Sequence, residues 1–108
     1  MSLSKNYDIF KGKEMKVSVK FLASIREIAD AHEILLEISS GDTVGTLLEI
    51  LESRFGTAFK DAVGKPFEDE SPKIRILVNG RDIDFLQGPK TELKNGDMVV
   101  LIPPVAGG

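Results

Sequence analysis

The chain ends with the sequence LKNGDMVVLIPPVAGG, residues 93–108, and this stretch carries the strongest structural signal. Its first part, LKNGD, combines polar residues with glycine and predicts a turn. Residues 98–102 are apolar and predict the last strand of a sheet. Pro103 and Pro104 stop that strand, because proline has no N–H for the ladder. Residues 103–108 are therefore expected to form an extended C-terminal tail.

Upstream, three segments alternate apolar and polar residues with the period of a half-buried strand. Their apolar positions are Val17, Val19 and Phe21, then Ile34, Leu36 and Ile38, then Ile74, Ile76 and Val78. Asn79-Gly80 follows the third segment and is a strong hairpin signal. Ile83 and Phe85 come next, and we expect them in a short extended piece.

Between these strands the apolar spacing changes to three and four residues, which predicts a helix over residues 43–55. Asp42 or Thr43 is expected to cap its start, and Gly56 to end it in a left-handed conformation. A shorter helical piece is predicted around residues 59–63. The face of the long helix consists of Val44, Leu47, Leu48, Leu51 and Phe55.

A short helix or turn is predicted over residues 24–31, with Ser24 as N-cap and Glu27 three residues later. A length of 108 residues suits one domain with one core. We expect a flexible N-terminal extension over residues 1–14, a folded domain over 15–102 and the tail. The order strand, strand, long helix, strand, short strand, strand predicts an α+β sheet with the helix packed across one face.

Composition excludes several classes of function. Apolar residues make up 42% and charged residues 29% of the chain, and the formal charge is only −3. A nucleic-acid partner is not expected, because no basic patch is present. The absence of cysteine excludes disulfides and thiolate metal sites within this chain. No apolar run approaches the roughly 20 residues that span a bilayer, and residues 1–8 lack a signal-peptide core, so we expect a cytoplasmic protein without membrane contact.

Three segments resemble the MoaD family. The first is FLASIRE, residues 21–27, which is similar to the family's F-x-A-x-x-R-E stretch. The second is Val78-Asn79-Gly80, and the third is residues 93–108, which is similar to the family's L-x-x-G-D-x-V-x-x-x-P-P-V-x-G-G ending. The third is the most specific, because turn, strand, diproline and diglycine come in order. The resemblance covers about residues 15–108.

The resemblance implies a β-grasp (ubiquitin-like) mixed sheet with one main helix, and the role of the small subunit of molybdopterin synthase. It implies that an E1-like, MoeB-like enzyme uses ATP to adenylate Gly108, after which sulfur gives a thiocarboxylate. The carrier then docks on a MoaE-like large subunit and delivers the sulfur to the pterin precursor of the molybdenum cofactor. It binds no cofactor or metal of its own.

The tail chemistry suits these residues. Glycine has no Cβ, so a diglycine end is expected to pass through a narrow channel of a partner. An extended segment of this length reaches about 20 Å, at roughly 3.3 Å per residue. The tail residues expected in the partner's active site are Pro103, Pro104, Val105, Ala106 and Gly107, with Gly108 as the reactive residue.

Strand parity predicts a docking surface. If Val17, Val19, Phe21 and their counterparts in the later strands (Ile74, Ile76, Val78, Val99, Leu101) face the helix, a second apolar set faces away. A domain with one main helix has nothing to cover that second face, and exposed apolar patches often mark protein contacts. The four predicted docking residues are Leu22, Leu77, Val100 and Ile102.

Other candidates carry less weight. His32 is the single histidine and is expected at the surface. The acidic residues 68–70 lie in the breaker-rich loop 64–73 and are expected to be solvated. Arg26 and Glu27 are expected to form a local ion pair or to hold the turn. No glycine-rich phosphate loop is present, so ATP belongs to the activating partner.

Three other functions stay open. One is a ThiS-like carrier that supplies sulfur for the thiazole of thiamin. Another is a ubiquitin-like modifier that is joined to lysines through Gly108, which passes through the same adenylate. The third is an adaptor that never uses its tail. An independent enzyme is the weakest reading, because the chain offers no nucleophile with an adjacent base.

Overall fold

A computed structural model describes residues 15–63 and 74–103 of the chain. Within these ranges the helices and strands alternate as the sequence predicts. In chain order they are β1 (Met15–Phe21), α2 (Ala23–Ala29), β2 (Glu33–Ile38), α3 (Val44–Phe55), α4 (Thr57–Val63), β3 (Arg75–Val78), β4 (Arg81–Asp82), the 3₁₀ helices η2 (Ile83–Phe85) and η3 (Gly88–Lys90), and β5 (Met98–Ile102).

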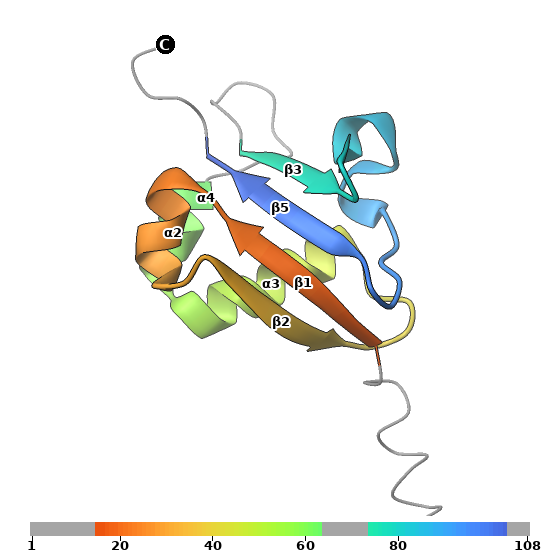
Figure 1. The fold of residues 1–108 in the computed structure, drawn as a ribbon, viewed down its shortest axis with the longest axis horizontal. Coiled ribbons are helices and arrows are strands. Elements are labelled where there is room, and N and C mark those ends of the chain that lie inside the picture. Colours follow the sequence, from red (N-terminus) through yellow and green to blue (C-terminus); the bar gives the residue numbers. More distant parts are fainter. Residues whose placement is uncertain (1–14, 64–73, 104–108) are drawn as a thin grey trace, which may run out of the picture.

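The five strands form one mixed sheet in the order β2-β1-β5-β3-β4. β1 and β5 are neighbours and run parallel, whereas β1–β2, β3–β5 and β3–β4 are antiparallel. The first and last strands of the described chain therefore lie side by side in the middle of the sheet, with α3 crossing behind it (Figure 1). This is the predicted β-grasp arrangement.

The hydrophobic core lies between the sheet and the helices. Side chains of alternate parity on the three long strands meet the apolar face of α3, whose Leu47 and Leu51 are fully buried. The strand residues predicted to face the helix are all buried, namely Val17, Val19, Phe21, Ile74, Ile76, Val78, Val99 and Leu101. Thr43 caps α3 as predicted, since its side-chain oxygen accepts from the N–H of Thr46 at 3.3 Å.

Three local predictions need correction. Ser24 is not an N-cap, because α2 begins one residue earlier at Ala23 and Leu22 precedes it without a side-chain cap. Gly56 has a positive φ of 83°, but its ψ of −162° lies outside the left-handed helical region. That extended geometry, which glycine tolerates, turns the chain directly into α4.

The third correction concerns Ile83 and Phe85, which form the 3₁₀ helix η2 rather than an extended piece. The carboxylate of Asp82 accepts from the N–H of Asp84 at 2.9 Å and starts this turn. A local side-chain hydrogen bond of this kind competes with strand geometry. The predictions for residues 1–14, the loop 64–73 and residues 104–108 lie outside the described residues.

Candidate functional site

The predicted tail leaves the fold from β5, the middle strand of the sheet. β5 is paired on both sides, with β1 and with β3, and Ile102 lies opposite Arg75 in the last pair. Pro103 follows this pair and is half-buried outside the ladder. Because both neighbouring strands hold β5, the sheet fixes the point at which the tail begins. The other tail residues predicted to be functional lie outside the described residues: Pro104, Val105, Ala106, Gly107 and Gly108.

Two of the three family-like segments meet at the opposite end of β5. The side-chain amide of Asn79 donates to Asp97 Oδ1 at 2.9 Å, and Asn79 Oδ1 accepts from the N–H of Met98 at 2.9 Å. Asp97 Oδ2 also accepts from the N–H of Lys94 at 2.8 Å. The hairpin residue Asn79 thus clamps the turn that starts β5. Sequence reasoning identified both turns but not their contact.

The same turn is tied to β1. The side chain of Asn95 accepts from the N–H of Lys16 at 2.8 Å, and the N–H of Gly96 donates to the carbonyl of Lys16 at 2.7 Å. Gly96 has a φ of +90°, which favours glycine. This turn therefore sets the parallel register of β1 and β5, and through it the position of the tail.

The remaining family-like segment, residues 21–27, begins at the last residue of β1, which pairs with β5 close to the start of the tail. The ring of Phe21 is fully buried and meets Phe55 edge-on, with 5.7 Å between ring centroids. Arg26 Nε donates to the carbonyl of Phe21 at 3.3 Å, and the N–H of Leu22 donates to the carbonyl of Leu101 at 3.3 Å. Arg26 therefore holds the strand-to-helix turn, as one of the two predictions proposed. Within residues 15–63 and 74–103 it forms no ion pair with Glu27.

The four predicted docking residues lie on the open face of the sheet, opposite the helices. Leu77 and Val100 are directly paired across β3 and β5, and Ile102 is two residues further along β5. Leu22 continues the extended backbone one residue beyond the last β1–β5 pair. All four side chains are half-buried. The structure thus places them together beside the root of the tail.

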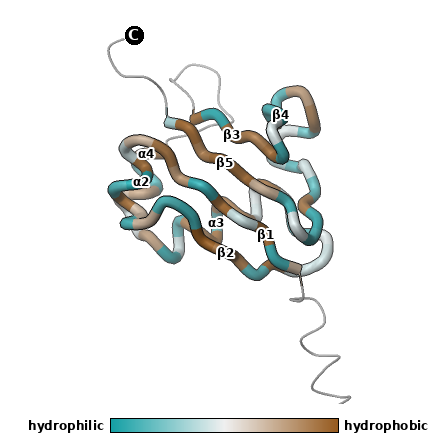
Figure 2. Tube along the Cα trace, in the orientation of Figure 1, coloured by the Kyte–Doolittle hydropathy of each residue, from teal (hydrophilic) through white to brown (hydrophobic). Residues whose placement is uncertain are grey.

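Most of the apolar residues on the strands of this open face belong to β5 and β3, and Leu35 on the edge strand β2 lies apart from them. On β1 the outward positions are Lys16, Ser18 and Lys20, and Lys20 lies between Glu33 and Val100 in the ladder. Figure 2 shows hydrophobic residues along β5 and β3 and a mixture along β1. The four predicted docking residues therefore occupy only the part of the face that adjoins the start of the tail.

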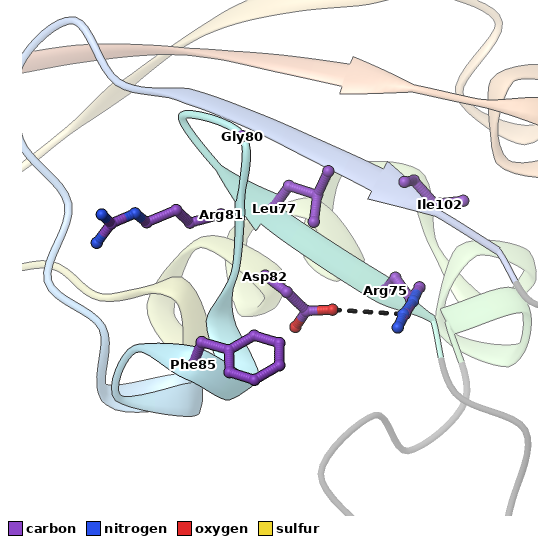
Figure 3. Close-up of a pocket in the computed structure, with 7 residues that line it drawn as sticks. All are labelled: Arg75, Leu77, Gly80, Arg81, Asp82, Phe85 and Ile102. Atoms are coloured by element: carbon purple, nitrogen blue, oxygen red, sulfur yellow. Dashed lines mark ion pairs between the residues drawn. The ribbon is translucent and has the colours of Figure 1, made fainter.

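One residue of this region, Phe85, is not among the site residues predicted from the sequence. Phe85 is predicted to lie with Ile83 in a short extended piece, but η2 buries Ile83, which is 4% exposed, and leaves Phe85 85% exposed. Phe85 borders a hollow of about 590 Å³ next to the docking surface (Figure 3). The lining residues are Arg75, Leu77, Gly80, Arg81, Asp82, Phe85 and Ile102. The pair of aspartates, Asp82 and Asp84, was the available signal for a turn at this point.

The described residues offer no metal site, since no group of three or more histidine, cysteine, aspartate or glutamate side chains converges among them. His32 is exposed, as predicted. None of the helices in the described part of the chain is both long and apolar enough to cross a membrane.

The fold and the site define a ubiquitin-like β-grasp domain whose central strand continues into a C-terminal tail beside an open apolar face. The model of the ThiS family matches residues 19–108. The chain belongs to the ThiS family, within the MoaD/ThiS group of ubiquitin-like sulfur carriers. The predicted relationship is thereby confirmed.

Similar proteins carry different functional names. Small archaeal modifier protein 3 of Haloferax volcanii is 34% identical over 96 residues, which cover 87% of this chain and 100% of that protein. The putative sulfur carrier protein of Archaeoglobus fulgidus is 36% identical over 97 residues, again with 87% and 100% coverage. The solved structure of a putative molybdopterin converting factor, subunit 1, from Pyrococcus furiosus has a TM-score of 0.70 at 34% identity, with 85% and 100% coverage.

Proposed function

We propose that this protein is the sulfur carrier of molybdenum cofactor biosynthesis and acts as the small subunit of molybdopterin synthase. The observation that supports this most is the position of the tail, which leaves a doubly paired central strand beside an apolar face. The likeness to the Pyrococcus furiosus protein and the Pro-Pro-Val-Ala-Gly-Gly ending favour this branch. These reactions would take place in the cytoplasm.

The proposed chemistry begins at the carboxylate of Gly108. This carboxylate attacks the α-phosphorus of ATP in an E1-like, MoeB-like enzyme, which forms an acyl-adenylate and releases pyrophosphate. A sulfide equivalent from a donor then attacks the acyl carbon, and AMP leaves. The resulting thiocarboxylate carries the sulfur to the pterin precursor in a MoaE-like large subunit, and hydrolysis restores the carboxylate.

The roles of this chain's own residues follow from where they lie. Leu22, Leu77, Val100 and Ile102 would hold the partner against the open face while the tail reaches the partner's active site. Because activation and delivery use the same tail, the two partners would occupy this surface in turn. The glycines would let the tail pass through a channel too narrow for a side chain.

Intact mass spectrometry tests the proposal. The protein is incubated with ATP, a sulfur donor and a cognate E1-like enzyme, and we expect a mass gain equal to the exchange of one oxygen for sulfur. A variant that lacks Gly108 should show no gain and an unchanged unfolding temperature, since the last strand, β5, ends at Ile102. Absence of any adenylate or thiocarboxylate with an active enzyme would reject the carrier function.

A second candidate is a protein modifier, which the similarity to small archaeal modifier protein 3 favours. In that case the activated Gly108 would acylate lysines of other proteins. A third fate is sulfur delivery to thiazole synthesis, as the name of the family model suggests. The purified thiocarboxylate distinguishes them: molybdopterin formed with a MoaE-like subunit supports the synthase, and isopeptide-linked peptides found by mass spectrometry support the modifier.

A further inference from the structure

Phe85 is an exposed aromatic residue on a well-fixed turn. Its neighbour Ile83 is buried, and the carbonyl of Ile83 accepts from the N–H of Leu86 at 2.9 Å. The start of the turn is held by Asp82, and the N–H of Gln87 donates to the buried Thr91 Oγ1 at 3.0 Å. Phe85 thus projects from a rigid base, and a rigid aromatic side chain binds a partner at low cost in conformational entropy.

The hollow beside Phe85 has an apolar wall and two arginines. Leu77 and Ile102 form the wall on the sheet side (Figure 3). Arg75 NH1 lies 3.6 Å from Asp82 Oδ2, so that carboxylate compensates one of the two cations. Arg81 is exposed at the end of the hollow away from Ile102 and has no carboxylate within ion-pair distance among residues 15–63 and 74–103.

The location of the hollow identifies its partner. Ile102 lines the hollow and is also the last residue of β5, so the tail begins at the edge of the hollow. An extended tail of six residues reaches at most about 20 Å. An enzyme that holds Gly108 therefore has its active site within about 20 Å of the hollow. Every proposed fate of Gly108 begins with adenylation, so the activating enzyme is the partner common to all of them.

We infer that the hollow receives a segment of the activating enzyme in which an apolar side chain is followed by a carboxylate. The apolar side chain would pack between Phe85 and the wall formed by Leu77 and Ile102. The carboxylate would pair with Arg81, whose charge is not compensated among residues 15–63 and 74–103. Phe85 and Arg81 are then specificity-determining residues that extend the docking surface beyond the open sheet face. This inference rests on the proposed activation of Gly108.

Steady-state activation kinetics test the inference. The rate of ATP-dependent pyrophosphate release is measured with the full-length protein as the varied substrate and a cognate E1-like enzyme. For Phe85→Ala and Arg81→Glu we expect KM to rise about tenfold or more, as for aromatic and arginine residues that anchor an interface. We expect kcat to stay within about twofold, because the substitutions remove contacts that contribute equally to the bound ground state and to the transition state. The KM of Phe85→Leu should fall between those of the wild type and Phe85→Ala.

Matched controls separate this hollow from general surface effects. Leu35→Ala removes the second large apolar side chain that is exposed in the described part of the chain, at 62% exposure on the far edge strand β2. Lys60→Glu makes the same charge change as Arg81→Glu on the helical layer, where Lys60 is exposed on α4. Both controls should keep the wild-type KM. Raised salt should weaken wild-type binding more than Arg81→Glu binding, because the ion pair is screened.

The outcomes are distinct. A raised KM in both variants with unchanged controls and unchanged unfolding temperatures supports the inference. Wild-type KM in both variants, while the wild type is activated normally, overturns it and leaves the proposed function intact. A raised KM in Phe85→Ala alone overturns the inference that a carboxylate of the enzyme pairs with Arg81. A wild type that the enzyme does not adenylate rejects the proposed function, and the inference with it.

Discussion

The two faces of the sheet use the same strands for different purposes. On the covered face, Val99 and Leu101 of β5 are fully buried against the helices. On the open face, the alternate residues Val100 and Ile102 are half-buried and have no helix over them among the described residues. One strand thus contributes to stability through one set of side chains and, as we propose, to partner binding through the other.

The difference follows from the number of layers. A two-layer domain covers only one face of its sheet, so apolar residues on the second face are available to other proteins. Lys16, Ser18 and Lys20 keep the β1 part of that face polar and so separate the apolar residues next to the tail from Leu35 on the edge strand β2. Substitutions on the covered face should therefore act on folding, and those on the open face should act on binding.

The largest expected effect is a difference in the free energy of unfolding between substitutions on the covered face and on the open face. Leu101→Ala removes a fully buried side chain and should lower the free energy of unfolding by about 2–5 kcal/mol. Leu77→Ala makes the same chemical change in the neighbouring strand on the open face and should cost less than half as much. Urea unfolding followed by circular dichroism measures both. Equal losses would contradict the distinction between the faces.

The clamp at the start of β5 should have the next largest effect. Asp97→Ala removes the acceptor of the bonds from Asn79 and Lys94, so we expect a loss of about 1–2 kcal/mol in the free energy of unfolding. Asp97→Asn keeps one carbonyl oxygen and should lie between the wild type and the alanine variant. Amide exchange at Met98 should accelerate in the alanine variant, whose β5 is less well anchored. Unchanged stability and exchange would show that the backbone turn holds this end alone.

Substitutions on the open face should change the affinity for the partner rather than the free energy of unfolding. Ile102→Ala is expected to weaken binding of the activating enzyme by about tenfold, or roughly 1.4 kcal/mol, since the residue lies in the docking surface next to the tail. Isothermal titration calorimetry on the purified pair measures this. Leu35→Ala, on the same face but at the far edge, serves as the control and should bind normally. An equal loss in both variants would place the docking surface across the whole face.

The smallest expected effect concerns the ion pair in the hollow. Arg75→Gln removes the contact with Asp82, but the Arg75 side chain is 62% exposed. An exposed pair contributes little, so the free energy of unfolding should change by less than about 1 kcal/mol. The difference between wild type and variant should shrink further at high salt. A loss as large as that of Asp97→Ala would mean that this pair is structural.

Local patterns were sufficient for most of the elements. The apolar spacing located α3, and Thr43 was one of the two predicted caps, because both signals depend on residues within one or two helical turns. Ser24 was wrongly predicted as the cap, because α2 begins at Ala23 and Ser24 therefore lies inside the helix. The extended conformation predicted for Phe85 was wrong, because the carboxylate of Asp82 starts a turn where the alternation of apolar residues alone predicts a strand.

The candidate site was predicted unevenly for the same reason. Leu22, Leu77, Val100 and Ile102 could be chosen from strand parity, since the alternation of side chains is a property of the strand itself. The hollow beside Phe85 could not be predicted, because it is formed between the 3₁₀ helix η2 and residues of β3 and β5. The sequence does not specify how these elements lie relative to one another.

The sequence by itself determined which residues face the helices, where the last strand stops and that the chain ends in a proline–glycine tail. These properties are local, because they depend on the period of the backbone and on the geometry of proline and glycine. Only the tertiary structure decided that β5 lies between β1 and β3, that Asn79 meets Asp97, and that Phe85 projects beside the tail root. Those features depend on hydrogen bonds and packing between segments far apart in the chain, which no local pattern specifies.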